Sequence, residues 1–102
     1  MKIYISGKIS GIPLDEARIK FENAESDITG IGETPVNSMK IGEYHPDKLW
    51  HEYMIEDISE LFKCDAILLL PCWAESKGAR IEKFIADELG LLIFRYDESG
   101  TF

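Results

Sequence analysis

The sequence predicts an α/β protein with a doubly wound, mainly parallel sheet of four to five strands and helices on both faces, as in flavodoxin-like and Rossmann-like folds. Short β-branched or apolar segments alternate with longer segments whose apolar residues recur at helical spacing. The apolar run at residues 65–70 is continuous, which is typical of a parallel strand covered on both faces. A β-α-β-α-β-α-β order with right-handed crossovers then gives a doubly wound sheet with its first strand in the centre.

Turn residues bound the predicted strands. The first strand runs into Gly7 and Gly11, and the last follows Gly90. The second contains Pro35, which favours an edge position because proline has no N–H to donate to a neighbouring strand. The predicted strands are residues 2–6, 34–37, 65–70 and 91–96.

Capping residues mark three predicted helices. The first begins at about Pro13 and ends before Gly30 and Gly32. The second opens at Pro46 and continues to about residue 63, and the third covers residues 78–89. Their expected inward-facing residues are Leu14, Ala17, Phe21, Ala24 and Ile28, then Trp50, Met54, Ile58 and Leu61, then Ile81, Phe84, Ile85 and Leu89.

Length and charge restrict the class of protein. The 102 residues are enough for one compact domain, which we expect to span residues 1–102. Hydrophobic residues make up 45% of the chain, so a packed core is expected rather than disorder. The formal net charge of −8 disfavours a nucleic-acid polymer as partner, because an acidic surface repels phosphate backbones. A small phosphorylated ligand remains compatible, because one local loop can dominate a small site.

Metal, redox and membrane roles are not indicated. Cys64 and Cys72 show no metal-ligand spacing and are expected to be buried thiols, and His45 and His51 do not share a helical face. We therefore expect neither a metal nor another cofactor. The chain has no signal peptide or membrane-spanning run, so we expect a cytoplasmic protein.

Two carboxylates lie near the edge of the sheet where such folds bind ligands, outside the carboxyl ends of the strands. Asp57 follows Met54 by three residues, at the edge of an apolar stripe. Glu82 shares a helical face with the small residues Gly78 and Ala86, which leave room for a ligand. Spacing alone favours two solvated surface carboxylates over a functional pair, because carboxylates at the edge of an amphipathic helix are common.

Two polar loops at the same edge have alternative interpretations. Ser76, Lys77 and Gly78 open a helix, where Ser76 caps the helix or the backbone N–H groups bind an anion. The glycine-bounded loop matches neither a Walker nor a GxGxxG pattern; its residues are Gly7, Lys8, Ile9, Ser10 and Gly11. Trp73 is interpreted as a lid over the edge or a hydrophobic plug, and Tyr4 as a core residue whose hydroxyl needs a partner.

Three segments together resemble a known superfamily. YISGKISG at residues 4–11, EDI at 56–58 followed by CDAI at 64–67, and WAESKGARIE at 73–82 resemble motifs of the nucleoside 2-deoxyribosyltransferase superfamily. The 2′-deoxynucleoside 5′-phosphate N-hydrolases are the most similar branch in this respect. The chain also resembles a family of small uncharacterised bacterial domains on this fold, over about residues 2–94.

The resemblance implies a function. It implies cleavage of the N-glycosidic bond of a 2′-deoxynucleoside 5′-monophosphate, by hydrolysis or base exchange. By motif position Glu82 matches the nucleophile, Asp57 the carboxylate that assists at the base, and Tyr4 the tyrosine that orients the nucleophile. Ser76 stands where the phosphohydrolases carry a serine, which implies a 5′-phosphate. The alternative is a catalytically inactive nucleotide-binding or interaction domain on the same fold.

The second helix predicts self-association. Trp50, Tyr53 and Phe62 give it more aromatic surface than one core-facing stripe needs. Because a short domain gains stability by burying such surface, we expect a homodimer or larger homo-oligomer.

Overall fold

A computed structural model describes residues 1–42 and 47–96. Four strands and three α-helices alternate along the chain, with two short 3₁₀ helices between them. The strands are β1 (Lys2–Ser6), β2 (Thr34–Asn37), β3 (Ala66–Leu69) and β4 (Leu92–Arg95). The α-helices are α1 (Leu14–Gly30), α2 (Trp50–Leu61) and α3 (Lys77–Leu89), and the 3₁₀ helices are η1 (Ser38–Lys40) and η2 (Trp73–Glu75).

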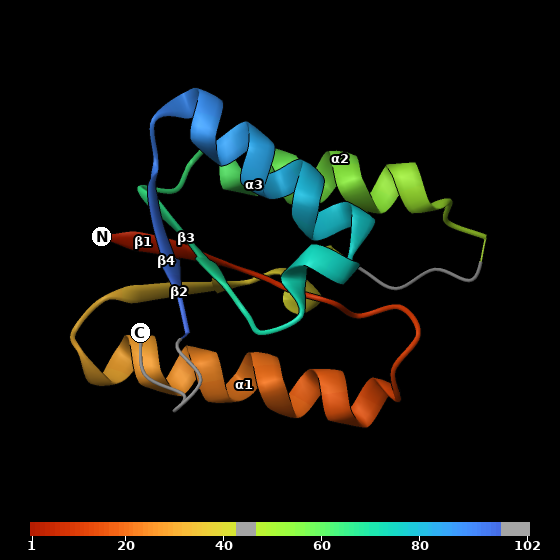
Figure 1. Cartoon of the computed structure of the whole chain (residues 1–102), viewed down its shortest axis with the longest axis horizontal. Helices are drawn as coiled ribbons and strands as arrows, with labels where there is room; N and C mark the ends of the chain where they lie inside the picture. Colours follow the sequence, from red (N-terminus) through yellow and green to blue (C-terminus); the bar gives the residue numbers. More distant parts are fainter. Residues whose placement is uncertain (43–46, 97–102) are drawn as a thin grey trace.

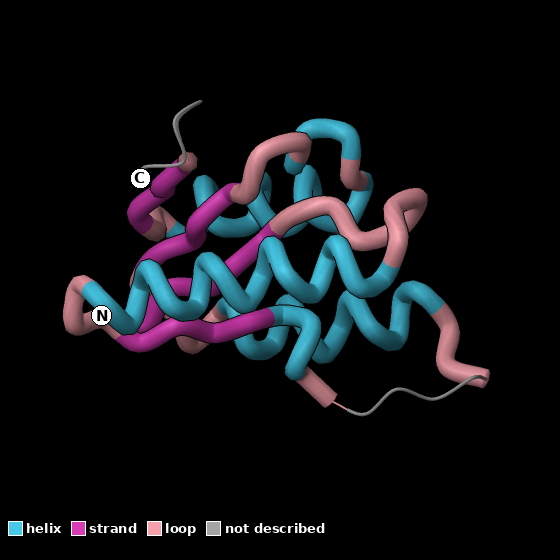
Figure 2. The backbone as a smooth tube through the Cα atoms, turned by 90° about the horizontal axis from the view of Figure 1, so that it is seen from below, coloured by secondary structure: helices cyan, strands magenta, loops and turns pink. Residues whose placement is uncertain are grey.

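The four strands form one parallel sheet in the order β2-β1-β3-β4. Strand β1 lies between β2 and β3, and β2, which contains Pro35, is an edge strand. Helix α1 covers one face of the sheet, while α2 and α3 lie on the other (Figure 1). Figure 2 shows α1 running along the strands when the molecule is seen from below. The doubly wound α/β fold with a central first strand is therefore confirmed.

Alternation along the central strands separates two apolar clusters. Ile3 and Ile5 of β1 pack toward α1, in a cluster with Phe21 and Ile28. Tyr4 points to the opposite face, toward α2 and α3. This is the period-two geometry of a strand, and it makes β1 part of both layers.

The helix boundaries follow local chemistry. Pro13 precedes α1, and Gly90 ends α3 with φ of +74°, a left-handed conformation that glycine adopts without strain. Helix α2 begins at Trp50, several residues later than predicted, and the Glu52 carboxylate accepts a hydrogen bond from the Leu49 N–H. Pro46, where the prediction placed the start, lies outside the described residues.

Four predictions of inward-facing residues are wrong. Trp50, Phe84 and Leu89 are exposed to 48%, 63% and 41%. Helix α3 instead buries Ala79, Glu82 and Ala86, because small side chains allow it to approach the sheet closely. Leu14 is also exposed, although the rest of the α1 stripe is buried as predicted.

The two thiols differ in environment. Cys64 is buried, as expected, but Cys72 is exposed in the loop after β3, so that part of the prediction is wrong. Within residues 1–42 and 47–96, no helix is both long and apolar enough to cross a membrane.

Candidate active site

A pocket of about 650 Å³ opens at the carboxyl ends of β1 and β3, beside α2 and α3. This is where ligands bind in open parallel sheets, because the strand order changes direction there. Many residues from four parts of the chain line the pocket. They are Gly7, Lys8, Ile9, Ser10 and Leu14, then Ser38, Met39, Ile41 and Gly42, then Lys48, Trp50, Tyr53, Met54 and Asp57, then Glu75, Ser76, Lys77, Gly78, Ala79 and Glu82.

Glu82 is a buried carboxylate that faces this pocket. Its side chain comes from the second turn of α3 and is only 5% exposed. The Tyr4 hydroxyl donates to Oε2 at 2.6 Å, and the Ser6 hydroxyl donates to Oε1 at 2.6 Å. Each carboxylate oxygen thus has a hydroxyl donor from β1, which fixes the plane of the group at one wall of the pocket.

Close backbone packing places the pocket walls. A Cβ atom on Gly7 would lie 2.9 Å from the Leu70 Cβ, so only glycine lets the chain leave β1 at this point. Gly78 brings α3 against Met54 of α2, whose sulfur would lie 3.2 Å from an added Cβ. The two glycines therefore bring the loop after β1 and the start of α3 close to their neighbours.

Burial sets the ionisation of Glu82 and Tyr4. Desolvation raises the pKa of Glu82, while the hydrogen bonds from Ser6 and Tyr4 act in the opposite direction. The pKa of the Tyr4 phenol is raised far above its ordinary value, first by burial and then by the charges of Glu82 and Asp57. Tyr4 therefore stays protonated and remains a donor to Glu82 at neutral pH.

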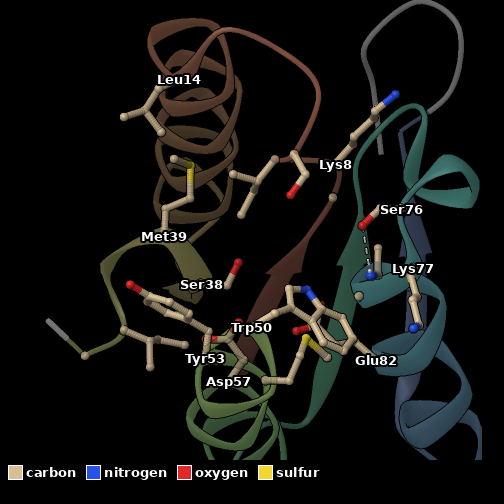
Figure 3. Close-up of a pocket in the computed structure, with 18 of the residues that line it drawn as sticks. Lys8, Leu14, Ser38, Met39, Trp50, Tyr53, Asp57, Ser76, Lys77 and Glu82 are labelled. Atoms are coloured by element: carbon tan, nitrogen blue, oxygen red, sulfur yellow. Dashed lines mark hydrogen bonds between the residues drawn. The ribbon is translucent and has the colours of Figure 1, made fainter. Parts of the chain in front are cut away.

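Asp57 supplies a second carboxyl group from α2. Figure 3 shows Asp57 and Glu82 coming from different helices to the same end of the pocket. Burial, and next the charge of Glu82, raise the pKa of Asp57 to about 7. A carboxyl group with this pKa can donate a proton near neutral pH and accept it back in a later step.

The start of α3 combines a cap with free backbone donors. The Ser76 hydroxyl accepts a hydrogen bond from the Ala79 N–H at 3.1 Å, so the capping interpretation of Ser76 is confirmed. Among the described residues, the N–H groups of Lys77 and Gly78 have no hydrogen-bond acceptor. Lys8 reaches the same edge and lies 3.8 Å from the Glu75 carboxylate.

Aromatic side chains of α2 form part of the wall. The Lys77 ammonium lies 5.1 Å from the centre of the Trp50 ring, a contact that links α3 to α2. The Lys48 ammonium lies 4.5 Å from the centre of the Tyr53 ring and also pairs with Glu56. This wall presents two aromatic rings to the pocket.

Three candidate residues do not line the pocket. Gly11 lies beyond its edge in a turn with φ of +85°. Trp73 packs against the cluster that contains Tyr4 and Leu61, and the Arg95 guanidinium lies 5.1 Å from the centre of its ring. Its contacts agree with the plug interpretation. Tyr4 lies beneath the pocket, in contact with Glu82.

Several residues that line the pocket or support Glu82 were not among the predicted site residues. Ser6 lies two residues after Tyr4, so strand alternation alone placed both hydroxyls on one face. Ser38 is buried and donates to the Ile5 carbonyl oxygen at 2.9 Å. Met39 and Lys48 carried no spacing signal that separates them from ordinary loop residues.

Metal ligation has no support in the described part of the chain. In residues 1–42 and 47–96, no group of three or more His, Cys, Asp or Glu side chains is arranged to hold a metal ion.

Comparison with models of known families identifies the family of this chain. Residues 1–95 match the model of a domain of unknown function, DUF4406. The chain belongs to this family. No curated protein matches it.

A solved structure also shares the fold of this DUF4406 protein. It is a 2-desoxiribosyltransferase from Leishmania mexicana, which superposes with a TM-score of 0.69 at 20% identity. The match covers 94% of the present chain and 65% of the Leishmania chain. The resemblance to the deoxyribosyltransferases noted from the motifs is thus confirmed for the fold, over nearly the full chain.

Proposed function

We propose that this DUF4406 protein cleaves the N-glycosidic bond of a 2′-deoxynucleoside 5′-monophosphate, with Glu82 as nucleophile. The observation that carries the proposal is the buried Glu82 carboxylate, fixed by the hydroxyls of Tyr4 and Ser6 and open to a pocket that also contains Asp57. Burying a carboxylate costs stability, and carboxylates whose pKa is perturbed by burial gather at functional sites. The fold shared with a 2-desoxiribosyltransferase adds support.

The reaction proceeds in two steps. A Glu82 oxygen attacks the anomeric carbon C1′, and the bond from C1′ to the base nitrogen breaks with its electron pair leaving on the base. Asp57 gives its proton to the departing base. A water molecule then attacks C1′, its proton passes to Asp57, and the glycosyl ester bond to Glu82 breaks, which restores the carboxylate. Attack by a second base in place of water gives base exchange.

The 5′-phosphate would bind at the start of α3. The N–H groups of Lys77 and Gly78 point out of the helix terminus, and the dipole there favours a negative charge. Lys77 and Lys8 add positive charge near the same edge. In this arrangement Ser76 acts mainly through its cap, which holds the helix terminus in shape.

The base would lie against the α2 wall. Trp50 and Tyr53 offer flat apolar rings, and stacking on such rings accepts any base because every base has a π-face. Met39 and Leu14 extend this apolar lining. No cofactor takes part in the proposed reaction.

One experiment tests the proposal. The purified protein is incubated with the four 2′-deoxynucleoside 5′-monophosphates, the matching deoxynucleosides and the ribonucleotides, and free base is measured by chromatography. Release of base from the deoxynucleoside monophosphates, faster than from the deoxynucleosides, is expected. If no compound releases base but a nucleotide raises the melting temperature, the inactive nucleotide-binding alternative replaces the proposal.

We also propose that the protein is a homodimer. Trp50 and Ile55 of α2 are exposed to 48% and 63%, and Phe62, which follows the last residue of this helix, to 60%. Burying such side chains against a second copy would stabilise a short domain. Light scattering should give the mass of a dimer, and a monomer at high micromolar concentration would contradict this.

A further inference from the structure

Ser6 lies where two strands fix it. It is the last residue of β1 and is fully buried. Its backbone pairs with β3, and its carbonyl oxygen accepts a hydrogen bond from the Leu70 N–H at 2.8 Å. The adjacent Gly7 packs on Leu70 without room for a Cβ. The position of the Ser6 hydroxyl is therefore set by the sheet rather than by a mobile loop.

The Ser6 hydroxyl directs its proton to one atom. It donates to Oε1 of Glu82 at 2.6 Å, a short distance typical of a bond from a hydroxyl to a charged acceptor. Tyr4 donates to the other oxygen, Oε2, at the same distance. Two donors on one strand face thus hold the two carboxylate oxygens at separate points.

We propose that Ser6 is a positioning residue, which fixes the orientation of the Glu82 carboxylate toward the pocket and supports its charge. The proposal rests on the role of Glu82 given above. With Tyr4 alone, the carboxylate could rotate about the bond to its carboxyl carbon. With both donors, the group is held in one plane and its remaining lone pairs face the ligand.

The same bond favours the reactive form of Glu82. Burial raises the pKa of Glu82, and the Ser6 hydrogen bond is the larger of the two that lower it again. Only the ionised carboxylate attacks C1′, so a weaker donor at position 6 reduces the reactive fraction at acidic pH. A residue that merely filled space would not change this pH dependence.

Three variants test the proposal. Ser6→Ala removes the donor, and Ser6→Cys replaces it with the weaker thiol donor. Ile28→Val is the control, because it removes a buried methyl group from the α1 face and lowers stability without touching the site. The measurements are the pH profile of base release from a deoxynucleoside monophosphate and the NMR titration of the ¹³C-labelled Glu82 carboxyl group.

Ser6→Ala should lower kcat by about 10–100-fold at pH 6, because a hydrogen bond to a charged group is lost, with little change in KM. In Ser6→Ala, the acid limb of the pH profile and the pKa of Glu82 measured by NMR should both move to higher pH. Ser6→Cys should give intermediate values, and Ile28→Val should give the values of the wild type. An unchanged Glu82 titration and pH profile in Ser6→Ala would overturn the proposal. If the wild type releases no base, the proposed function fails, but a raised Glu82 pKa in Ser6→Ala still supports the role of Ser6.

Discussion

The two faces of strand β1 are built from the same short segment but have different chemistry. Ile3 and Ile5 point toward α1, where Phe21 and Ile28 complete a wholly apolar cluster. Tyr4 and Ser6 point the other way, where their hydroxyls meet the carboxylate of Glu82. One face buries hydrocarbon, and the other buries a charge with its hydrogen-bond donors.

This difference separates stability from function within one strand. Burying apolar surface stabilises the fold directly. Burying a carboxylate opposes folding, and its hydrogen bonds offset this only in part, since the pKa of Glu82 stays raised. Substitutions at Glu82 and its two hydroxyl donors should therefore act mainly on activity, whereas substitutions in the apolar cluster on the α1 face should act on stability.

The largest expected effect is on activity, from Glu82→Gln. The amide has nearly the same shape and can still bond to both hydroxyls, but it is a poor nucleophile. Base release should fall by about 10⁴-fold or more, as when other catalytic nucleophiles are removed. Nucleotide affinity, measured by calorimetry, should remain. A variant as active as the wild type would exclude Glu82 as the nucleophile.

On the α1 face, Phe21→Ala should act on stability instead. Phe21 is fully buried in the apolar cluster, so the cavity should lower the free energy of unfolding by about 3–5 kcal/mol. Urea denaturation measures this loss. The folded fraction should keep the pH profile of the wild type, whereas a shifted profile would show that the two faces are not independent.

Tyr4→Phe should have a smaller effect on the Glu82 face. The ring remains in the core, and only the donor to Oε2 is lost. Base release should fall by about 10–100-fold, the value of one hydrogen bond to a charged group. Comparing steady-state kinetics of Tyr4→Phe with those of Glu82→Gln tests this order, and a larger loss in Tyr4→Phe would contradict it.

The smallest effect concerns stability against pH. Because the folded-state pKa of Asp57 is raised to about 7, the folded protein binds more protons than the unfolded chain between about pH 4 and 7. Asp57 therefore destabilises the fold progressively as the pH rises through this range. In thermal melts, the melting temperature of Asp57→Asn relative to that of the wild type should increase as the pH is raised toward 8.

The control is Asp15→Asn, which removes a carboxylate that is 79% exposed on α1. It should change the melting temperature similarly at pH 5 and pH 8. If Asp57→Asn behaves in the same way as this control, Asp57 does not carry the raised pKa on which its acid role depends.

The sequence predicts the sheet better than it predicts the site. The continuous apolar run of β3 and the glycines at the ends of α1 and α3 indicate the α/β order. The orientation of α3 was harder to predict. Helical spacing and hydrophobicity place Phe84 in the core, whereas in the structure the small residues Ala79 and Ala86 face the sheet and Phe84 is exposed. Periodicity identifies an apolar face, but it does not show that close helix packing prefers small side chains.

The site depends on contacts between distant residues. Tyr4 and Ser6 lie 78 and 76 positions before Glu82, and only the placement of α3 over β1 brings them together. A serine before Gly7 looks like an ordinary turn residue in the sequence. The motif resemblance assigned roles to Glu82, Asp57 and Tyr4, but it assigned none to Ser6, although Ser6 lies within one of the motifs.

The most direct test of the central claim is to look for the covalent bond to Glu82. The protein is mixed with a deoxynucleoside monophosphate, quenched in acid during turnover, digested and analysed by peptide mass spectrometry. The account predicts a deoxyribosyl-phosphate adduct on the peptide that contains Glu82, and none in Glu82→Gln. An adduct on a residue other than Glu82 would contradict the account. So would the absence of any adduct in the wild type together with base release by Glu82→Gln.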